Sequence, residues 1–503
     1  MLLILFNIMK DFNYYLNSIG EIGYVEQTTS SIMYASGLPG VKPRELVFFE
    51  NGEVGQVLSV SYNLIEILVF TRNPLKAGGK VVRTNEFLNI PVGPELLGSV
   101  IDSLGNSLEG LTIQRKPMLS SRSVTANPTG ILTRKTITKQ LETGVSIVDL
   151  LLPLGYGQRE LIIGDRKTGK TNFLFQAVLT QARLGNICIY AAIGKKRVDI
   201  KVLKEFFQKY NILKNIVIVA SGSEDPTGLI YLTPYSAMAI SEYFRDEGHD
   251  VLLILDDLST HAKFYREISL LGKRFPGRNS YPGDIFYIHA ILLERAGNFA
   301  TQYGEKAITC LPVAETVQGD LSGYIQTNLM SMTDGHLYFD SELFAKGRRP
   351  PINPFLSVTR VGRQTQSNIK REISREILSF LTLFEKMQNF THFGAELNET
   401  TKISLSVGEA ITRFFDQLPS TTIPMNVQVV LFCLLWNNAK QIGAPTNEPD
   451  LARIIKIYEA NSNIRKMIDT MVQGATSFNE LLGTVKQKGD ELLAIINKSN
   501  YDK

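Results

Sequence analysis

The sequence predicts three successive folds: a small N-terminal β-barrel, a central α/β domain on a parallel sheet, and a C-terminal α-helical bundle. From Ile22 to about Val92, short alternating apolar runs are broken by glycine, and turn signals about every 8–12 residues are typical of a small barrel or sandwich. In the middle of the chain, near-continuous apolar runs such as residues 251–256 alternate with helical stretches, as expected for strands buried on both faces of a parallel sheet. Beyond Gly362, apolar residues recur at three- and four-residue spacing, which predicts helices.

These changes of pattern divide the chain into four segments. We predict a short N-terminal extension at 1–19, the β-barrel at 20–93, the α/β domain at 94–362 and the helical domain at 363–503. Between Gly105 and Thr143 the composition shifts to Ser, Thr, Pro, Arg and Lys without periodicity, which predicts a linker or a loop over the next domain. Helices are expected at residues 199–210, 237–246, 369–391, 406–417, 427–439 and 448–469.

Composition excludes several classes of function. Lys and Arg exceed Asp and Glu by only four, a balance that indicates neither nucleic acid nor an acidic partner. The barrel segment lacks clustered Lys and Arg among aromatic residues, so we predict no nucleic-acid binding there. Cys188, Cys310 and Cys433 are far apart in apolar surroundings, so neither a metal cluster nor a disulfide framework is expected. The apolar residues 1–9 are too few to span a bilayer and lack the features of a signal peptide.

A strand that runs into a glycine-rich turn carries the clearest chemical signal. Residues 161–171 read Leu-Ile-Ile-Gly-Asp-Arg-Lys-Thr-Gly-Lys-Thr, and the spacing of Gly164, Gly169, Lys170 and Thr171 satisfies the P-loop pattern. In such a loop backbone N–H groups converge on phosphate oxygens, the lysine reaches the β- and γ-phosphates, and the threonine contacts Mg²⁺. Residues 172–179 continue with helical composition and no Gly or Pro. The sequence therefore predicts a nucleotide site.

Two further positions decide what such a site can do. Four apolar residues lead directly into Asp256, which suits an acid that holds Mg²⁺ through its water shell better than a helix cap or a solvated turn. Hydrolysis also needs a carboxylate that orients water, and the natural place is the end of the strand after the P-loop helix. That place reads Ala-Ile-Gly-Lys-Lys-Arg at 192–197. Lys195 can pair with phosphate but cannot act as a base, so we expect ATP binding with poor hydrolysis.

Six segments together resemble the α-type members of the F-type rotary ATP synthase α/β family, from Gly20 onward. The matching segments are residues 20–23, 90–98, 157–166, 256–259, 281–284 and 357–362. The resemblance implies that the central domain is a P-loop (RecA-like) nucleotide-binding domain. It further implies an alternating hexamer with a β-type catalytic subunit around a central stalk. The water-orienting glutamate of that catalytic subunit corresponds to the position of Lys195.

The resemblance also implies roles for individual residues. Arg360 would reach in trans into the neighbouring β-type site and stabilise charge on the transferring phosphate, whereas from the residues alone it would be a surface salt-bridge partner. Ser357 would matter for activity through the same interface, and Ser331 and Lys195 would lie at the interface. For Ser331 and Arg349, ordinary loop polarity stays an open alternative. The residues implied to hold ATP or ADP with Mg²⁺ are Gly164, Asp165, Arg166, Lys167, Thr168, Gly169, Lys170, Thr171, Asp256, Arg349 and Gln417.

The chain departs from the family pattern at several positions. Lys167 and Lys195 stand where the family usually has glutamine, so two extra positive charges are expected to face the nucleotide. Thr359 replaces a serine, and of two glutamines expected near the adenine only Gln417 has a counterpart. The N-terminal extension that grips the peripheral stalk is much shortened, which leaves the mode of stalk attachment open.

The sequence therefore predicts a nucleotide-binding, non-catalytic α-type subunit of a rotary ATP synthase that transports H⁺ or Na⁺. Its expected place is peripheral, on the cytoplasmic side of a bacterial inner membrane or on the matrix or stroma side of an organelle inner membrane. A ring-forming helicase or terminator-like ATPase is one alternative, although it should carry the glutamate after the P-loop helix, as should an export ATPase. A scaffold whose P-loop no longer binds nucleotide is another.

Overall fold

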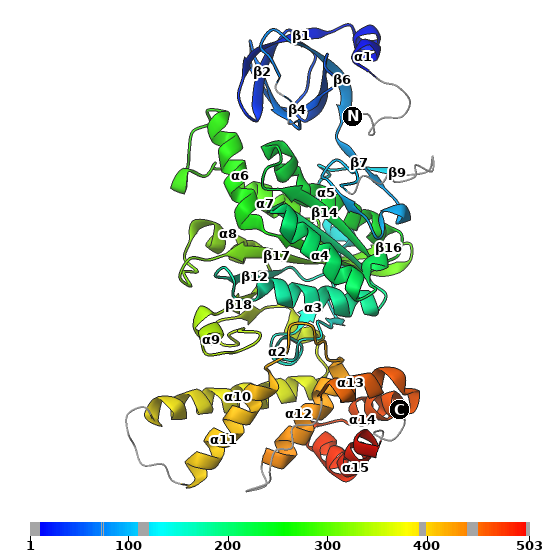
Figure 1. The fold of residues 1–503 in the computed structure, drawn as a ribbon, viewed down its shortest axis with the longest axis vertical. Helices are drawn as coiled ribbons and strands as arrows, with labels where there is room; N and C mark the ends of the chain where they lie inside the picture. Colours follow the sequence, from blue (N-terminus) through cyan, green and yellow to red (C-terminus); the bar gives the residue numbers. More distant parts are fainter. Residues whose placement is uncertain are drawn as a thin grey trace.

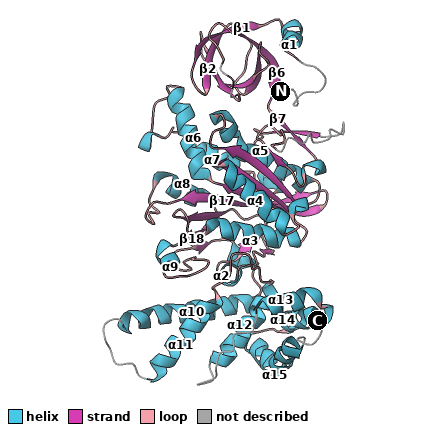
Figure 2. Cartoon of the chain, in the orientation of Figure 1, coloured by secondary structure: helices cyan, strands magenta, loops and turns pink. Residues whose placement is uncertain are grey.

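Three domains stack along the long axis of the molecule, with the barrel at one end and the helical domain at the other (Figure 1). The computed structural model describes residues 11–71, 73, 75–108, 120–391, 399–439 and 451–498. The apolar run at 1–9 lies outside these residues. Strands are confined to the barrel and the central domain, and the last domain is helical (Figure 2). The predicted fold class is confirmed.

The N-terminal domain is a closed six-stranded antiparallel barrel with the strand order β1-β2-β5-β4-β3-β6. Its interior is filled by apolar side chains that include Met33, Val47 and Ile67, the inward members of the alternating runs. Tyr15 of helix α1 (Phe12–Ile19) packs against Phe48 on the outside of the barrel. The strands are β1 (Ile22–Thr28), β2 (Ile32–Ser36), β3 (Glu45–Phe49), β4 (Val54–Val60), β5 (Ile65–Val69) and β6 (Lys80–Phe87).

The central domain is built on a nine-stranded sheet with the order β19-β18-β12-β17-β15-β13-β14-β8, and β16 pairs with β17. Pairing is parallel except at β16 and β19. The strands are β8 (Val100–Ile101), β12 (Glu160–Gly164), β13 (Ile187–Lys195), β14 (Ile216–Gly222), β15 (Val251–Asp256), β16 (Gly297–Thr301), β17 (Gly304–Glu315), β18 (Gly335–Phe339) and β19 (Val358–Thr359). Short strands outside this sheet are β7 (Asn89–Val92) with β9 (Ser120–Ser123), and β10 (Gln140–Leu141) with β11 (Leu154–Gly155).

Helices cover both faces of the sheet, so its strands are buried on both sides. In β15, Leu252 and Ile254 face a cluster shared with α3 and α4, whereas Leu253 and Leu255 face a cluster shared with α5 and α6. The α-helices of this domain are α2 (Ser146–Leu151), α3 (Lys170–Arg183), α4 (Arg197–Lys209), α5 (Thr227–Asp246), α6 (Leu258–Leu271), α7 (Ile285–Glu294), α8 (Tyr324–Met332) and α9 (Ser341–Ala345). Short 3₁₀ turns are η1 (Pro94–Leu96), η2 (Ile131–Thr133), η3 (Leu213–Asn215), η4 (Arg278–Ser280) and η5 (Gly362–Thr365).

The C-terminal domain is helical as predicted, but its helix boundaries differ from the expected ones. The helix expected at 448–469 is wrong as one element, because the chain leaves the helical conformation at Asn461, whose side chain accepts hydrogen bonds from Asn463 N (3.0 Å) and Ile464 N (3.3 Å). Such a side-chain cap begins a new helix. The helices are α10 (Asn368–Thr391), α11 (Glu399–Phe414), α12 (Met425–Ala439), α13 (Leu451–Ala460), α14 (Ser462–Gly474) and α15 (Phe478–Lys498). No helix in the described ranges has both the length and the apolarity to cross a bilayer.

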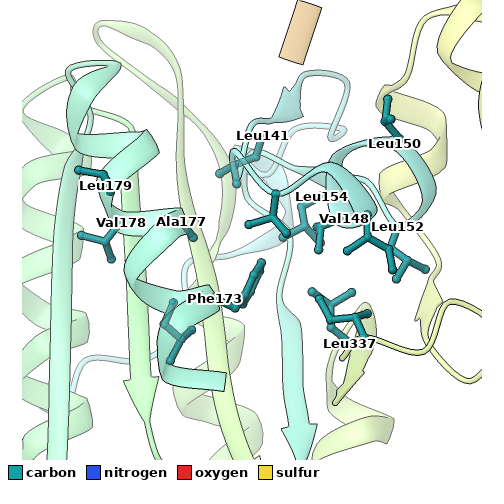
Figure 3. Packing of buried hydrophobic residues seen from close by; sticks show 14 of the residues in the cluster. Leu141, Val148, Leu150, Leu152, Leu154, Phe173, Ala177, Val178, Leu179 and Leu337 are labelled. Carbon is teal, nitrogen blue, oxygen red and sulfur yellow. The ribbon is translucent and has the colours of Figure 1, made fainter. Parts of the chain in front are cut away.

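The apolar cores continue from one domain into the next. Phe173 on α3 points toward Val148 and Leu154, with Leu337 of β18 close by (Figure 3). The same cluster includes Phe432 from the C-terminal helices. On the other face of the sheet, the core includes barrel residues such as Ile32, Leu46 and Leu68. Each neighbouring domain therefore buries apolar surface against the central one, which favours a fixed arrangement.

A fully buried ion pair ties α7 to α5. Arg295 has no exposed surface, and its guanidinium donates two hydrogen bonds of 2.9 Å to Glu242 and one of 2.8 Å to the carbonyl of Val124. The Arg295 guanidinium and the Glu242 carboxylate are both buried in the protein interior, where an unpaired charge is costly.

We expect Arg295→Met to lower the free energy of unfolding by about 3–5 kcal/mol, because the Glu242 carboxylate loses its bidentate partner inside the protein. Thermal unfolding followed by circular dichroism measures the effect, with Arg197→Met on the exposed first turn of α4 as the control. The double variant Arg295→Met/Glu242→Leu should recover most of the loss, since it removes both charges. A single variant as stable as the wild type would contradict this account.

Candidate functional site

The P-loop lies between β12 and α3, at the carboxyl end of the central strands. β12 ends at Gly164, and α3 begins at Lys170 directly after Gly169, whose φ of 91° favours glycine. The Lys170 ammonium folds back over the loop and donates to the carbonyls of Gly164 (2.8 Å) and Asp165 (2.6 Å). Burial lowers the pKa of Lys170, while the carboxylates of the site oppose this effect. The strand, turn and helix expected from the sequence are all present.

Side chains of the loop itself hold it in place. The Asp165 carboxylate accepts from Thr316 Oγ1 (2.6 Å) and from the N–H of Gly319 (3.0 Å), which fastens the loop to the chain after β17. Burial raises the pKa of Asp165, but these hydrogen bonds outweigh burial and the net shift is downward. Arg166 pairs with Glu315 at 2.8 Å and is 70% exposed. Asp165 therefore acts as an anchor for the loop, since a carboxylate repels phosphate.

Lys167, Thr168 and Thr171 complete the loop. Thr168 is buried and its hydroxyl donates to the carbonyl of Asp165 at 2.7 Å. Lys167, with a positive φ of 64°, and Thr171 are both exposed. The positive charge and the hydroxyl expected to face a ligand are thus accessible from solvent.

Lys195 forms an ion-paired cluster with the two acids that end β15. β13 and β15 are neighbours, and Ala192 lies opposite Asp256 in their register. The Lys195 ammonium contacts Asp256 Oδ1 at 2.7 Å and Asp257 Oδ2 at 3.2 Å. Asp256 Oδ2 accepts from the hydroxyl of Tyr190 at 2.7 Å, and Asp257 Oδ1 accepts from Thr260 N at 2.7 Å. The sequence identified Asp256 and Lys195 separately but did not predict their contact.

Burial and ion pairing shift the pKa values of Asp256 and Lys195. Burial raises the pKa of Asp256, and Lys195 offsets part of that rise. Burial lowers the pKa of Lys195, but attraction to Asp256 and Asp257 outweighs burial and raises it overall. The ammonium is therefore charged at neutral pH. Two of its N–H donors point to carboxylates of this chain, a contact that was not expected from the sequence.

The residues predicted to hold Mg²⁺ are Thr171, which is exposed, and Asp256, which is buried. Mg²⁺ demands octahedral oxygen ligands and their water shell, yet both Asp256 oxygens already accept hydrogen bonds from Tyr190 and Lys195. Among the described residues, no group of three or more His, Cys, Asp and Glu side chains could hold a metal ion. In this arrangement the donor set does not fit the metal.

Arg360 and Ser357 lie at the edge of the sheet, where β19 pairs with β18. Ser357 is buried; its hydroxyl donates to the carbonyl of Asn353 (2.6 Å) and accepts from Tyr338 N (2.9 Å). Thr359 donates to the carbonyl of Pro153 at 3.0 Å. Arg360 is exposed, and within the described part of the chain its guanidinium forms no ion pair or hydrogen bond. β18 separates this strand from the P-loop strand.

The three remaining predicted residues have local partners. The Arg349 guanidinium stacks 3.7 Å from the centre of the Phe344 ring. Gln417 is 4% exposed, and its amide accepts from Ser146 N (3.2 Å) and donates to the carbonyls of Gly144 (2.7 Å) and Thr421 (2.6 Å). Ser331 is exposed and donates to Asn328 O at 2.7 Å.

Tyr190, Asp257 and Glu315 belong to the site but were absent from the sequence prediction. Asp257 directly follows Asp256, and this adjacency was an available signal. Tyr190 lies on β13 and Glu315 on β17, the two strands that flank β15, so they could be found only once the strand order was known.

A glycine-rich loop between a parallel strand and a helix, with a lysine at the helix start, defines a P-loop nucleotide-binding protein. Residues 144–359 match the nucleotide-binding domain of the ATP synthase alpha/beta family, and residues 366–500 match the C-terminal domain of ATP synthase alpha/beta chains. The chain belongs to the ATP synthase alpha/beta family, as its resemblance predicted.

Three similar curated proteins are ATP synthase alpha subunits. The protein of Neorickettsia sennetsu is 41% identical over 463 residues, which cover 90% of each chain. That of Petrotoga mobilis is 40% identical over 433 residues, covering 83% of this chain and 84% of the relative. That of Helicobacter pylori is 37% identical over 417 residues and 82% of each chain.

We expect Lys170→Met to weaken ATP binding by about 10–100-fold, because a charge-assisted hydrogen bond to phosphate contributes about 1.5–3 kcal/mol. Equilibrium dialysis of the purified chain against ATP measures the change. Lys196→Met, an exposed lysine just before α4, should bind as the wild type does. Equal affinity in the wild type and Lys170→Met would exclude the P-loop as the phosphate site.

Proposed function

We propose that the chain is the nucleotide-binding, non-catalytic α-type subunit of a rotary F-type ATP synthase, which couples transport of H⁺ or Na⁺ to the interconversion of ADP plus phosphate and ATP. The observation that carries this proposal is the contact of Lys195 with Asp256 and Asp257. Water attack on ATP needs a free carboxylate beside the γ-phosphate. At this position the chain has a charged amine that is itself bound to carboxylates.

The neighbouring acids support the same conclusion. Asp256 and Asp257 each accept a hydrogen bond on both oxygens, and Glu315 is paired with Arg166. Each of these carboxylates is thus held by groups of this chain and is not free to orient a water molecule beside the γ-phosphate. We therefore propose a site that holds ATP or ADP on the P-loop without cleaving it. Both oxygens of Asp256 hold partners of this chain, so the proposed ligand is the nucleotide without the Mg²⁺ predicted at Thr171 and Asp256.

We further propose that Arg360 supplies positive charge in trans to the catalytic site of a neighbouring β-type subunit. Its backbone is fixed, since Arg360 N donates to Asp334 O at 3.0 Å and the flanking Ser357 and Thr359 hydroxyls are both hydrogen-bonded. Its side chain is exposed at the sheet edge. A fixed backbone with a free guanidinium suits a residue that contacts a partner's phosphate.

The partners proposed are a β-type subunit in an alternating hexamer, a central stalk and a peripheral stalk, with no nucleic acid. Ser331, exposed on α8, is proposed to face the β-type subunit. Membrane association would then be peripheral and through the complex. It would be on the cytoplasmic side of a bacterial inner membrane, or on the matrix or stroma side of an organelle inner membrane.

The in-trans role is tested in the complex reconstituted with its β-type partner. We expect Arg360→Ala to lower steady-state ATP hydrolysis by about 10³–10⁵-fold, the range found for arginine fingers. Arg360→Lys should also fail, because a single ammonium cannot reproduce the planar guanidinium contact. Arg363→Ala, an exposed arginine on η5, serves as the control. Near-normal turnover in a correctly assembled Arg360→Ala complex would exclude the role.

The non-catalytic role is tested on the isolated chain. We expect ATP to bind while hydrolysis stays at least about 100-fold below that of the complex with the β-type subunit, since general-base catalysis contributes about 10²–10⁴-fold. Release of phosphate under identical conditions, with the reconstituted complex as reference, measures this difference. Turnover by the isolated chain at the rate of the complex would refute the role assigned to Lys195.

A further inference from the structure

We propose that this nucleotide site takes ATP or ADP in a form free of divalent metal, with the Lys195 ammonium in the place that Mg²⁺ would need beside Asp256. This inference rests on the proposed function, because it assumes that the P-loop holds a nucleotide. It goes further by assigning the chemical form of the ligand.

Every oxygen of the two carboxylates already accepts a hydrogen bond within the chain, and the cation beside both acids is the Lys195 ammonium. Asp256 uses one oxygen for Lys195 and the other for Tyr190. Asp257 uses one oxygen for Lys195 and the other for the backbone N–H of Thr260, where it caps α6. Mg²⁺ at this place would compete with Lys195 for both acids, and its binding would separate the ammonium from its ion-pair partners.

The Lys195 ammonium retains a donor beyond those that it gives to the two acids. An ammonium group has three N–H donors, and two of them point to Asp256 and Asp257. Among the described residues no acceptor takes the third, and the side chain is 26% exposed. A phosphate oxygen placed on the P-loop can accept this hydrogen, so one amine can connect the acids to the ligand as a metal with its waters would.

The charged side chains around the P-loop also bear on the need for a metal. Lys170 lies close enough to Asp256, Asp257 and Lys195 for their charges to shift its pKa, so the cluster and the P-loop form one site. Lys167, exposed on the loop, adds a further positive charge. Lys195 offsets one of the two negative charges of Asp256 and Asp257, and Lys167 and Lys170 add two positive charges on the loop, which reduces the need for a divalent cation at the phosphates.

The test measures ATP binding to the purified full chain by equilibrium dialysis, once with excess Mg²⁺ and once with EDTA. For the wild type we expect the two dissociation constants to agree within about threefold, less than the loss of one charged hydrogen bond would cause. In Lys195→Gln we expect binding in EDTA to weaken by about tenfold or more and to recover with Mg²⁺, because the amide frees Asp256 and supplies no charge. Lys196→Gln is the matched control and should resemble the wild type.

The outcomes separate this inference from the proposed function. Wild-type binding that is tenfold or more weaker in EDTA would overturn the metal-free site and leave nucleotide holding intact. An absence of ATP binding under both conditions would overturn both. The wild-type comparison is decisive even if Lys195→Gln fails to fold. In that case Lys195→Arg, which keeps the charge, should retain binding in EDTA, and a strict Mg²⁺ requirement in that variant would count against the inference.

Discussion

The contact of Lys195 with Asp256 and Asp257 is the interaction on which the chemistry of the central domain depends. Two adjacent carboxylates at the end of a buried strand repel each other and are costly to ionise, so a cation must lie between them. Here that cation is part of the chain, because the register of β13 and β15 places Ala192 opposite Asp256 and brings Lys195 to the two acids. The same amine stands where a water-orienting carboxylate would be needed. One ion pair therefore stabilises the end of β15 and removes a general base from the site.

The order of strands keeps the nucleotide site apart from the surface proposed to serve a partner. The P-loop follows the central strand β12, whereas Arg360 follows the edge strand β19, with β18 between them. A central strand is covered by helices and suits a site that must exclude water. An edge strand leaves side chains exposed to a neighbouring subunit, and hydrogen bonds from Ser357 and Thr359 hold its backbone in position. Both hydroxyls donate to backbone carbonyls, and threonine at residue 359 supplies such a hydroxyl.

Features encoded by neighbouring residues could be predicted from the sequence, and features that depend on strand order could not. The barrel strands, the apolar strand before Asp256 and the P-loop each follow from a local pattern, and the structure contains them. The ion pair of Lys195 joins residues 61 positions apart and requires β13 beside β15, an order that hydrophobic pattern does not encode. The break at Asn461 was missed because apolar periodicity continues through it, while the cap that ends it is one side-chain contact. Gln417 was assigned from resemblance to the adenine end, but its amide is satisfied by the chain itself.

Buried polar contacts also fix the position of the P-loop helix α3 relative to the C-terminal domain. Gln176 on α3 donates to the carbonyls of Leu418 (3.1 Å) and Thr421 (2.8 Å). The fully buried Asp149 carboxylate accepts from the backbone of Gly144 (2.9 Å) and from Gln428 on α12 (2.8 Å). Separating the two domains would remove both acceptors of the Gln176 amide and one donor to the Asp149 carboxylate, which keeps Thr143 and Gly144. A buried neutral group left unpaired in this way costs about 1–3 kcal/mol. The helix that starts at Lys170 is thus anchored at its far side to the helical domain. A change at the P-loop that moved α3 would have to break these contacts or carry the helical domain with it.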